Sequence, residues 1–305
     1  MCYSPAGMSS DPLDRVARLP CWSVPVVPQP ITGGITNSNF LVHDRGQRFF
    51  VRIGDDIPVH GVWRWNELAA SRAAHAAGIS PPVVYAEPGA MVLSFIEGTT
   101  LQAEDLRQPQ TLKRVLPLVR RCHNEMGRHH QGPTLLFWVF QVLRAYGATL
   151  RAGGSLHAEK LDRLLSIAAE LESAVGPVDI VFGHNDLLAA NFIDDGERLW
   201  LVDWDYAGFN SPLFDLGGLA SNSELPPDLE RWLLEEYFQA PVTRDLERRY
   251  GAMKCASLLR ETMWSMVSEM HSTVEFDYAV YTDENLRRFE GAYGVWKNSS
   301  SPEAR

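Results

Sequence analysis

The sequence has few cysteines and no long apolar run, and both absences narrow the class of protein. The four cysteines are widely spaced and contain no C-x-x-C pair. This spacing predicts neither a disulfide framework nor a zinc ribbon, and free thiols in a chain of this size favour a reducing compartment. No stretch reaches the roughly 18 apolar residues of a membrane-spanning helix, and no apolar run of signal-peptide length begins the chain. We therefore expect a cytoplasmic protein without a membrane span.

Basic side chains are in the minority. The chain has 28 Lys and Arg residues against 38 Asp and Glu residues, so its formal net charge is −10. A chain of this charge is a poor ligand for nucleic acid or for an anionic membrane surface. We expect small-molecule partners and no nucleic acid, and nothing in the sequence predicts an oligomeric state.

The order of secondary-structure patterns predicts two lobes. Residues 39–43 and 48–53 form a predicted hairpin, a predicted helix spans 62–77, and residues 91–96 form a further strand. After residue 100 the apolar spacing is mostly helical, with a β interlude at 180–204 and a return to helices from Leu229 to Tyr293. These patterns predict an α+β chain with a β-rich lobe over residues 11–97 and a mostly helical lobe over 98–297.

The segment around residues 184–203 contains the strongest chemical pattern. His184, Asp186 and Asn191 form an H-x-D-x-x-x-x-N motif, and the strand that follows ends in Asp203. Phosphoryl transfer from ATP needs a carboxylate that orients the attacking hydroxyl and hard oxygen ligands that hold Mg²⁺ against the phosphates. We predict Asp186 as the catalytic base and Asn191 and Asp203 as the metal ligands. His184 is predicted to support the loop through hydrogen bonds.

A plainer interpretation of these polar residues is that they are helix caps and turn carboxylates. The spacing favours the catalytic interpretation, because Asn191 lies five positions after Asp186 and Asp203 twelve positions after Asn191. The first interval suits one tight loop. The second suits a hairpin that turns at residues 194–197.

On these motifs the chain resembles the choline/ethanolamine kinase family, within the wider group of aminoglycoside-phosphotransferase-like and protein-kinase-like proteins. The resemblance extends from about Asp14 to Tyr293. It implies a two-lobed protein-kinase-like fold, with a small β-rich N-terminal lobe, a larger helical C-terminal lobe and ATP bound between them.

The resemblance also implies which residues hold the nucleotide. The segment 33–39 resembles the family's phosphate-covering loop, although a Gly-Gly pair alone also suits a plain turn. Arg52 matches the basic residue that reaches the ATP phosphates, and Glu67 matches its acidic partner. The segment 93–98 resembles the hinge whose backbone pairs with adenine. The implied nucleotide-binding residues are Gly33, Gly34, Thr36, Asn37, Asn39, Arg52, Glu67, Phe95 and Glu97.

Aromatic residues in the C-terminal half resemble the family's substrate region. A quaternary ammonium has no N–H donors and is held by aromatic faces. We expect Tyr206, Trp264 and Tyr278 to form such a cage, with Phe276 and Tyr281 as weaker candidates. The same aromatics also suit an ordinary core. The chain departs from the larger choline kinases in having Val267 three residues after Trp264 and Asn222 near a position that is often acidic.

Together these features predict an ATP- and Mg²⁺-dependent kinase that phosphorylates the hydroxyl of choline or ethanolamine by direct in-line transfer. Within enzymes, the alternatives are an aminoglycoside or other antibiotic phosphotransferase and a thiamine kinase. A third alternative belongs to another class, a non-catalytic pseudokinase that binds a nucleotide or a cationic ligand.

Overall fold

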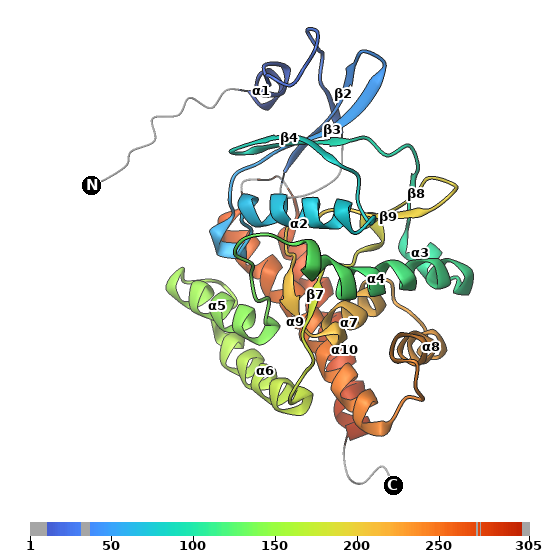
Figure 1. The fold of residues 1–305 in the computed structure, drawn as a ribbon. Helices are drawn as coiled ribbons and strands as arrows, with labels where there is room; N and C mark the ends of the chain where they lie inside the picture. Colours follow the sequence, from blue (N-terminus) through green and yellow to red (C-terminus); the bar gives the residue numbers. More distant parts are fainter. Residues whose placement is uncertain (1–10, 32–36, 273, 275, 301–305) are drawn as a thin grey trace.

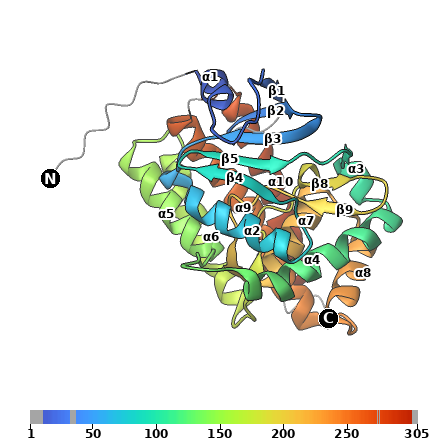
Figure 2. The ribbon, with the colours of Figure 1, turned by 45° about the horizontal axis from the view of Figure 1, so that its top comes forward.

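The computed structural model describes residues 11–31, 37–272, 274 and 276–300. A small antiparallel sheet lies above a larger body of helices, and the helix α2 lies between them (Figures 1 and 2). The helices are α1 (Pro12–Ala17), α2 (Arg64–Ala76), α3 (Ala103–Leu106), α4 (Pro109–His129), α5 (Val139–Ala152), α6 (Leu161–Val175), α7 (Pro212–Asn222), α8 (Pro227–Phe238), α9 (Arg244–His271) and α10 (Tyr278–Ser300). Short 3-10 turns lie at Pro58–His60, Ala158–Lys160 and Ala189–Asn191.

The first lobe is built on a five-stranded antiparallel sheet in the order β1-β2-β3-β5-β4. Its strands are β1 (Gln29–Ile31), β2 (Ser38–Asp44), β3 (Gln47–Ile53), β4 (Val83–Glu87) and β5 (Ala90–Ser94). The β2–β3 hairpin turns through Arg45 and Gly46, both at positive φ, as a tight two-residue turn requires. Alternate residues of β2, among them Phe40 and Val42, are buried in a small core that also contains Val16 of α1.

The helix α2 belongs to a different core. Its alanines Ala70, Ala73 and Ala74 are buried in the larger hydrophobic cluster, which continues through α4 and the other helices of the second lobe. Short alanine side chains let the two helices approach closely, and they also favour helix formation. Gly78, at a φ of +71°, ends this segment, as the sequence predicted.

Two small sheets carry the loops of the second lobe. Strand β7 (Val181–Gly183) pairs with β10 (Gly208–Asn210), and the order β6-β8-β9 joins Thr99–Thr100 to the hairpin of Phe192–Asp194 and Leu199–Leu201. The connection between the lobes therefore pairs directly with the hairpin that precedes Asp203. Gly98 is needed there because a Cβ would lie 2.5 Å from the carbonyl oxygen of Asp194.

The long helix α9 organises the helical lobe. It contacts α5, α6, α7 and α10, and its residues from Ala252 to Ser268 are largely buried. Pro109 lies in the first turn of α4, and the helical conformation is interrupted between α3 and α4 at this point. Pro117 lies inside α4 without ending it.

The predicted β-rich lobe followed by a helical lobe is confirmed, as are the hairpin, the helix at 62–77 and the β interlude. One boundary was wrong. Helices resume at Pro212 with α7 and not at Leu229, because Ser211 caps a helix whose residues are almost all buried and show no amphipathic spacing. In the part of the chain that the structure describes, none of the helices has the length and apolar character that crossing a membrane requires.

Candidate active site

The loop that carries Asp186 is fixed by a buried carboxylate. Asp215, in the first turn of α7, accepts hydrogen bonds from the backbone N–H groups of His184 and Asn185 at 2.8 and 2.7 Å. His123 of α4 lies 2.9 Å from the same carboxylate. Burial alone would raise the pKa of Asp215, but the hydrogen bond and charge of His123 hold it below its ordinary value. This network fixes the loop that the H-x-D motif predicted.

His184 supports the loop as predicted. Its Nε2 lies 3.0 Å from the carbonyl oxygen of Val202, so the residue before Asp203 is joined to the catalytic loop. Burial lowers the pKa of His184, which favours the neutral form of the ring. Asn185 and Asp203, on either side of this contact, both adopt positive φ, at 66° and 71°. Non-glycine residues rarely adopt this conformation, and such residues cluster at active sites.

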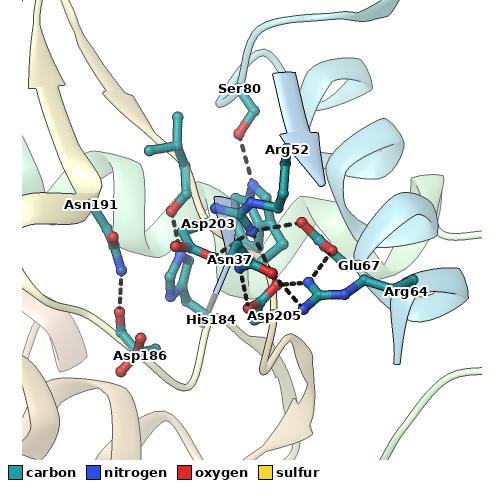
Figure 3. Close-up of polar contacts among 12 residues, drawn as sticks. Asn37, Arg52, Arg64, Glu67, Ser80, His184, Asp186, Asn191, Asp203 and Asp205 are labelled. Carbon is teal, nitrogen blue, oxygen red and sulfur yellow. Dashed lines mark hydrogen bonds and ion pairs between the residues drawn. The ribbon is translucent and has the colours of Figure 1, made fainter. Parts of the chain in front are cut away.

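Asn191 is joined to Asp186 within the same loop. Its side-chain Nδ2 donates to the backbone carbonyl of Asp186 at 2.8 Å (Figure 3). The backbone N–H of Val202 donates to the carbonyl of Asn191. The hydrogen bond of the amide nitrogen fixes the orientation of the Asn191 side chain. The amide oxygen is then the atom that could bind a metal ion. The structure brings Asp186, Asn191 and Asp203 onto adjoining segments, as the spacing predicted.

The environment of Asp186 is unusual for a carboxylate. Burial raises its pKa to about 8, the nearby carboxylates Glu261, Asp203 and Asp205 act in the same direction, and Arg260 opposes them. A strongly perturbed carboxyl group beside other charges is typical of a catalytic position.

A cluster of charges joins the two lobes beside Asp203. Arg52 of β3 donates through Nη1 to Glu67 of α2 at 2.6 Å, to Asp203 at 2.9 Å and to Asp205 at 3.0 Å (Figure 3). The predicted pairing of Arg52 with Glu67 is therefore present, and both side chains are buried. Burial would raise the pKa of Asp203, but Arg52 lowers it. Burial and the charges of Glu67 and Asp203 raise the pKa of Asp205 to about 7.

One member of this cluster, Arg64, was not predicted from the sequence. Arg64 donates to Glu67 at 2.7 Å and to Asp205 at 2.9 Å, so it doubles the positive charge that the carboxylates face. Its spacing of three residues before Glu67 on one helix is the signal that could have identified it. Asn37, predicted to contact phosphate, accepts from Arg64 at 2.6 Å and donates to Asp205 at 3.3 Å.

The other predicted nucleotide residues differ in how they are placed. Gly33, Gly34 and Thr36 lie outside the described residues. Asn39 on β2 pairs in register with Arg52 on β3, so it lies on the strand beside that of the predicted phosphate-binding arginine.

The predicted hinge residues Phe95 and Glu97 directly follow β5, an inner strand of the five-stranded sheet. The guanidinium carbon of Arg48 lies 4.9 Å from the ring centroid of Phe95, and Arg48 forms an ion pair with Glu97. The backbone N–H of Phe95 donates to the carbonyl of Arg48. Contact between these residues and adenine stays a prediction.

The predicted metal ligands fit Mg²⁺ in the chemistry of their donors. In the described part of the chain, no group of three or more His, Cys, Asp or Glu residues could hold a metal ion alone. Mg²⁺ is commonly held by one or two protein carboxylates together with substrate phosphates. One carboxylate from Asp203 and one amide oxygen from Asn191 fit that pattern.

The three predicted cage aromatics lie together but are buried. Trp264 donates through Nε1 to the Tyr206 hydroxyl at 2.9 Å, and the rings of Trp264 and Tyr278 lie 6.1 Å apart. Each of the three is at most 8 % exposed. The guanidinium of Arg260 covers the Tyr206 ring at 4.3 Å. Substrate contact by these aromatics stays a prediction.

Comparisons with known proteins agree with this geometry. A sequence model of the family described as choline/ethanolamine kinase matches residues 28–221. The chain is 26% identical over 278 residues to protein LicA of Haemophilus influenzae, covering 88% of this chain and 79% of that protein. It is 24% identical over 315 residues to mouse ethanolamine kinase 2, covering 92% of this chain and 81% of the relative.

A solved structure supports the fold. The crystal structure of a choline/ethanolamine kinase family protein from Mesorhizobium loti is similar to this chain, with a TM-score of 0.75 and 26% sequence identity. The similarity covers 95% of this chain and 94% of that one. The predicted two-lobed, kinase-like fold is confirmed.

Proposed function

This chain belongs to the choline/ethanolamine kinase family, and we propose that it transfers the terminal phosphoryl group of ATP to the hydroxyl of choline, ethanolamine or a related amino alcohol. The observation that carries the proposal is the convergence of Asp186, Asn191 and Asp203 beside the Arg52–Glu67 pair. Family membership alone would leave open whether these residues stand together.

In this proposal Asp186 accepts the hydrogen bond of the substrate hydroxyl and orients its oxygen toward the terminal phosphorus. The new oxygen–phosphorus bond forms as the bond to the leaving ADP oxygen breaks, and the hydroxyl proton passes to Asp186. Arg52 binds phosphate oxygens through its planar guanidinium, and Glu67 orients Arg52. Asn191 and Asp203 would hold Mg²⁺, which when bound neutralises charge on the phosphates.

Replacement of the base tests this assignment. We expect Asp186→Asn to lower kcat by about 10²–10⁴-fold while ATP still raises the melting temperature, because the amide cannot accept the proton. The measurement is formation of phosphorylated product from choline, ethanolamine, thiamine and kanamycin. Asp162→Asn, on an exposed carboxylate paired with Arg151, is the control and should keep normal activity.

The outcomes separate the alternatives. Near-normal turnover by the Asp186→Asn variant would remove Asp186 from the role of base. Activity confined to kanamycin would indicate an antibiotic phosphotransferase. Stabilisation by ATP that needs no Mg²⁺, with no product from any acceptor, would indicate a pseudokinase.

A further inference from the structure

Two charged residues at the substrate side of the site have no role in the proposed chemistry. Arg260 and Glu261 follow each other on α9 and line a small pocket that also contains Asp186, Asn222 and Ser257. Phe214 is the pocket's one aromatic lining residue in the described part of the chain. The space beside the predicted base is therefore lined mainly by carboxylate, amide and hydroxyl groups.

The carboxylate of Glu261 is held in a fixed orientation. The Tyr281 hydroxyl donates to its Oε1 at 2.8 Å, and Nη1 of Arg260 donates to its Oε2 at 2.9 Å. The Glu261 side chain keeps 21% of its surface exposed. A carboxylate has about four acceptor sites, so two donors leave acceptor capacity on both oxygens. A ligand with N–H groups could use that capacity.

The aromatic faces of the predicted cage already have partners within the protein. The Arg260 guanidinium lies 4.3 Å from the Tyr206 ring centroid, in the arrangement that a ligand cation would adopt. The ring of Trp264 lies 5.1 Å from that of His60. A quaternary ammonium depends on such faces because it has no N–H donor, whereas a primary ammonium has three donors for a carboxylate.

We propose that Glu261, oriented by Tyr281 and Arg260, selects amino alcohols whose nitrogen carries N–H donors, such as ethanolamine, over a quaternary ammonium such as choline. The inference rests on the proposed function and deepens it. In the bound substrate the hydroxyl faces Asp186 and the ammonium donates to Glu261, while the phosphoryl transfer is unchanged.

A series of acceptors that differ only in methylation tests the proposal. The substrates are ethanolamine, N-methylethanolamine, N,N-dimethylethanolamine and choline, each with MgATP and the full-length protein. We expect kcat/KM to fall along the series and to be at least about tenfold lower for choline than for ethanolamine. Glu261→Gln should lower the value for ethanolamine about 10- to 100-fold and change that for choline about threefold at most.

Two further variants keep the test independent of folding. Tyr281→Phe removes the donor that orients Glu261 but keeps the carboxylate, so it should reduce the preference in the same direction by a smaller factor. Glu230→Gln is the matched control, since Glu230 also accepts from a tyrosine, Tyr250, and from a cation, Lys254, on the contact between α8 and α9. This control should keep the preference of the unmodified protein.

Two results would overturn the proposal: equal or better use of choline by the unmodified protein, or an unchanged preference in Glu261→Gln. If no acceptor is phosphorylated, the proposed function fails instead. Calorimetric binding of the same four amines then decides the role of Glu261, and choline bound as tightly as ethanolamine would refute it.

Discussion

The two sides of the candidate site hold their buried cations in different ways. On the nucleotide side, Arg52 and Arg64 share the carboxylates of Glu67, Asp203 and Asp205. On the acceptor side, Arg260 pairs with Glu261, its one ion-pair partner among the described residues, and lies against the rings of Tyr206 and Phe137. The first arrangement joins segments from both lobes by charge. The second is built within the helical lobe from rings and hydroxyl groups.

This difference determines what each side loses when a group is removed. A buried charge that loses its counter-charge is costly, whereas a ring or hydroxyl leaves only a cavity or an unmade hydrogen bond. The nucleotide side should therefore be sensitive to the loss of a single charge, and the acceptor side should tolerate the loss of a ring or a hydroxyl group.

The largest expected effect is that of removing Arg52. Arg52→Met leaves Asp203 without its arginine partner, and Arg64 alone then faces Glu67 and Asp205. We therefore expect a loss of about 3–5 kcal/mol in the free energy of unfolding, together with loss of turnover. Urea denaturation measures the first and product formation the second. Arg163→Met breaks an exposed pair with Glu290 and should change stability by about 1 kcal/mol at most. Equal losses in the two variants would contradict the comparison.

Arg64 should matter less, because Arg52 still faces the same carboxylates when Arg64 is absent. We expect Arg64→Gln to cost about 1.5–3 kcal/mol of unfolding free energy, which corresponds to lost hydrogen bonds to charged groups. Denaturation of the single and double variants measures how strongly the two guanidiniums depend on each other. A loss as large as that of Arg52→Met would show that the two arginines contribute equally to stability.

On the acceptor side, a buried histidine gives an effect that is absent near neutral pH and grows as the pH falls. His60 lies between the Tyr146 hydroxyl and Ser268, and its pKa is lowered to about 3 by burial and by the charges of Arg260 and His271. In the unfolded chain the same group takes up a proton near pH 6.5. Its contribution to stability is therefore complete above that pH and is lost as the pH falls toward 3.

Denaturation between pH 7 and 4 measures this loss. We expect His60 to reduce the unfolding free energy by at most about 1.4 kcal/mol per pH unit below pH 6.5. His60→Gln should show a shallower fall than the unmodified protein, and His43→Gln, at an exposed position, should not. Parallel curves for the unmodified protein and His60→Gln would show that His60 is not buried in its neutral form.

The parts of the site that the sequence predicted are those fixed by short spacing. Asp186, Asn191 and Asp203 lie on one loop and one hairpin, so counting residues was enough to place them together. Arg52 and Glu67 came from family resemblance, since fifteen residues and a turn separate them. Arg64 and Glu261 were missed because their roles depend on which distant segment faces their helix. Glu261 stands three residues before Trp264 on α9, a helical spacing that could have drawn attention to it.

Elements with periodic apolar spacing, or bounded by a glycine, could be predicted from the sequence. Elements that are apolar throughout could not. Gly46 and Gly78 marked a turn and a helix end correctly, whereas α7 is buried on every side and has no period to detect. The sequence also grouped α2 with the sheet that surrounds it in the chain. Its alanine face instead packs against α4, a preference that only the three-dimensional arrangement reveals.

The packing of α2 against the main core has a consequence for how the activity could be regulated. A helix whose alanine face is embedded in the main core, and whose Asn66 side chain donates to the carbonyl of Ala207 at 2.8 Å, cannot swing outward without breaking that core open. Displacement of this helix would be a costly way of turning the molecule off. We therefore expect the active arrangement of the two lobes to be present at all times, so that the rate of turnover depends on the concentrations of nucleotide and acceptor.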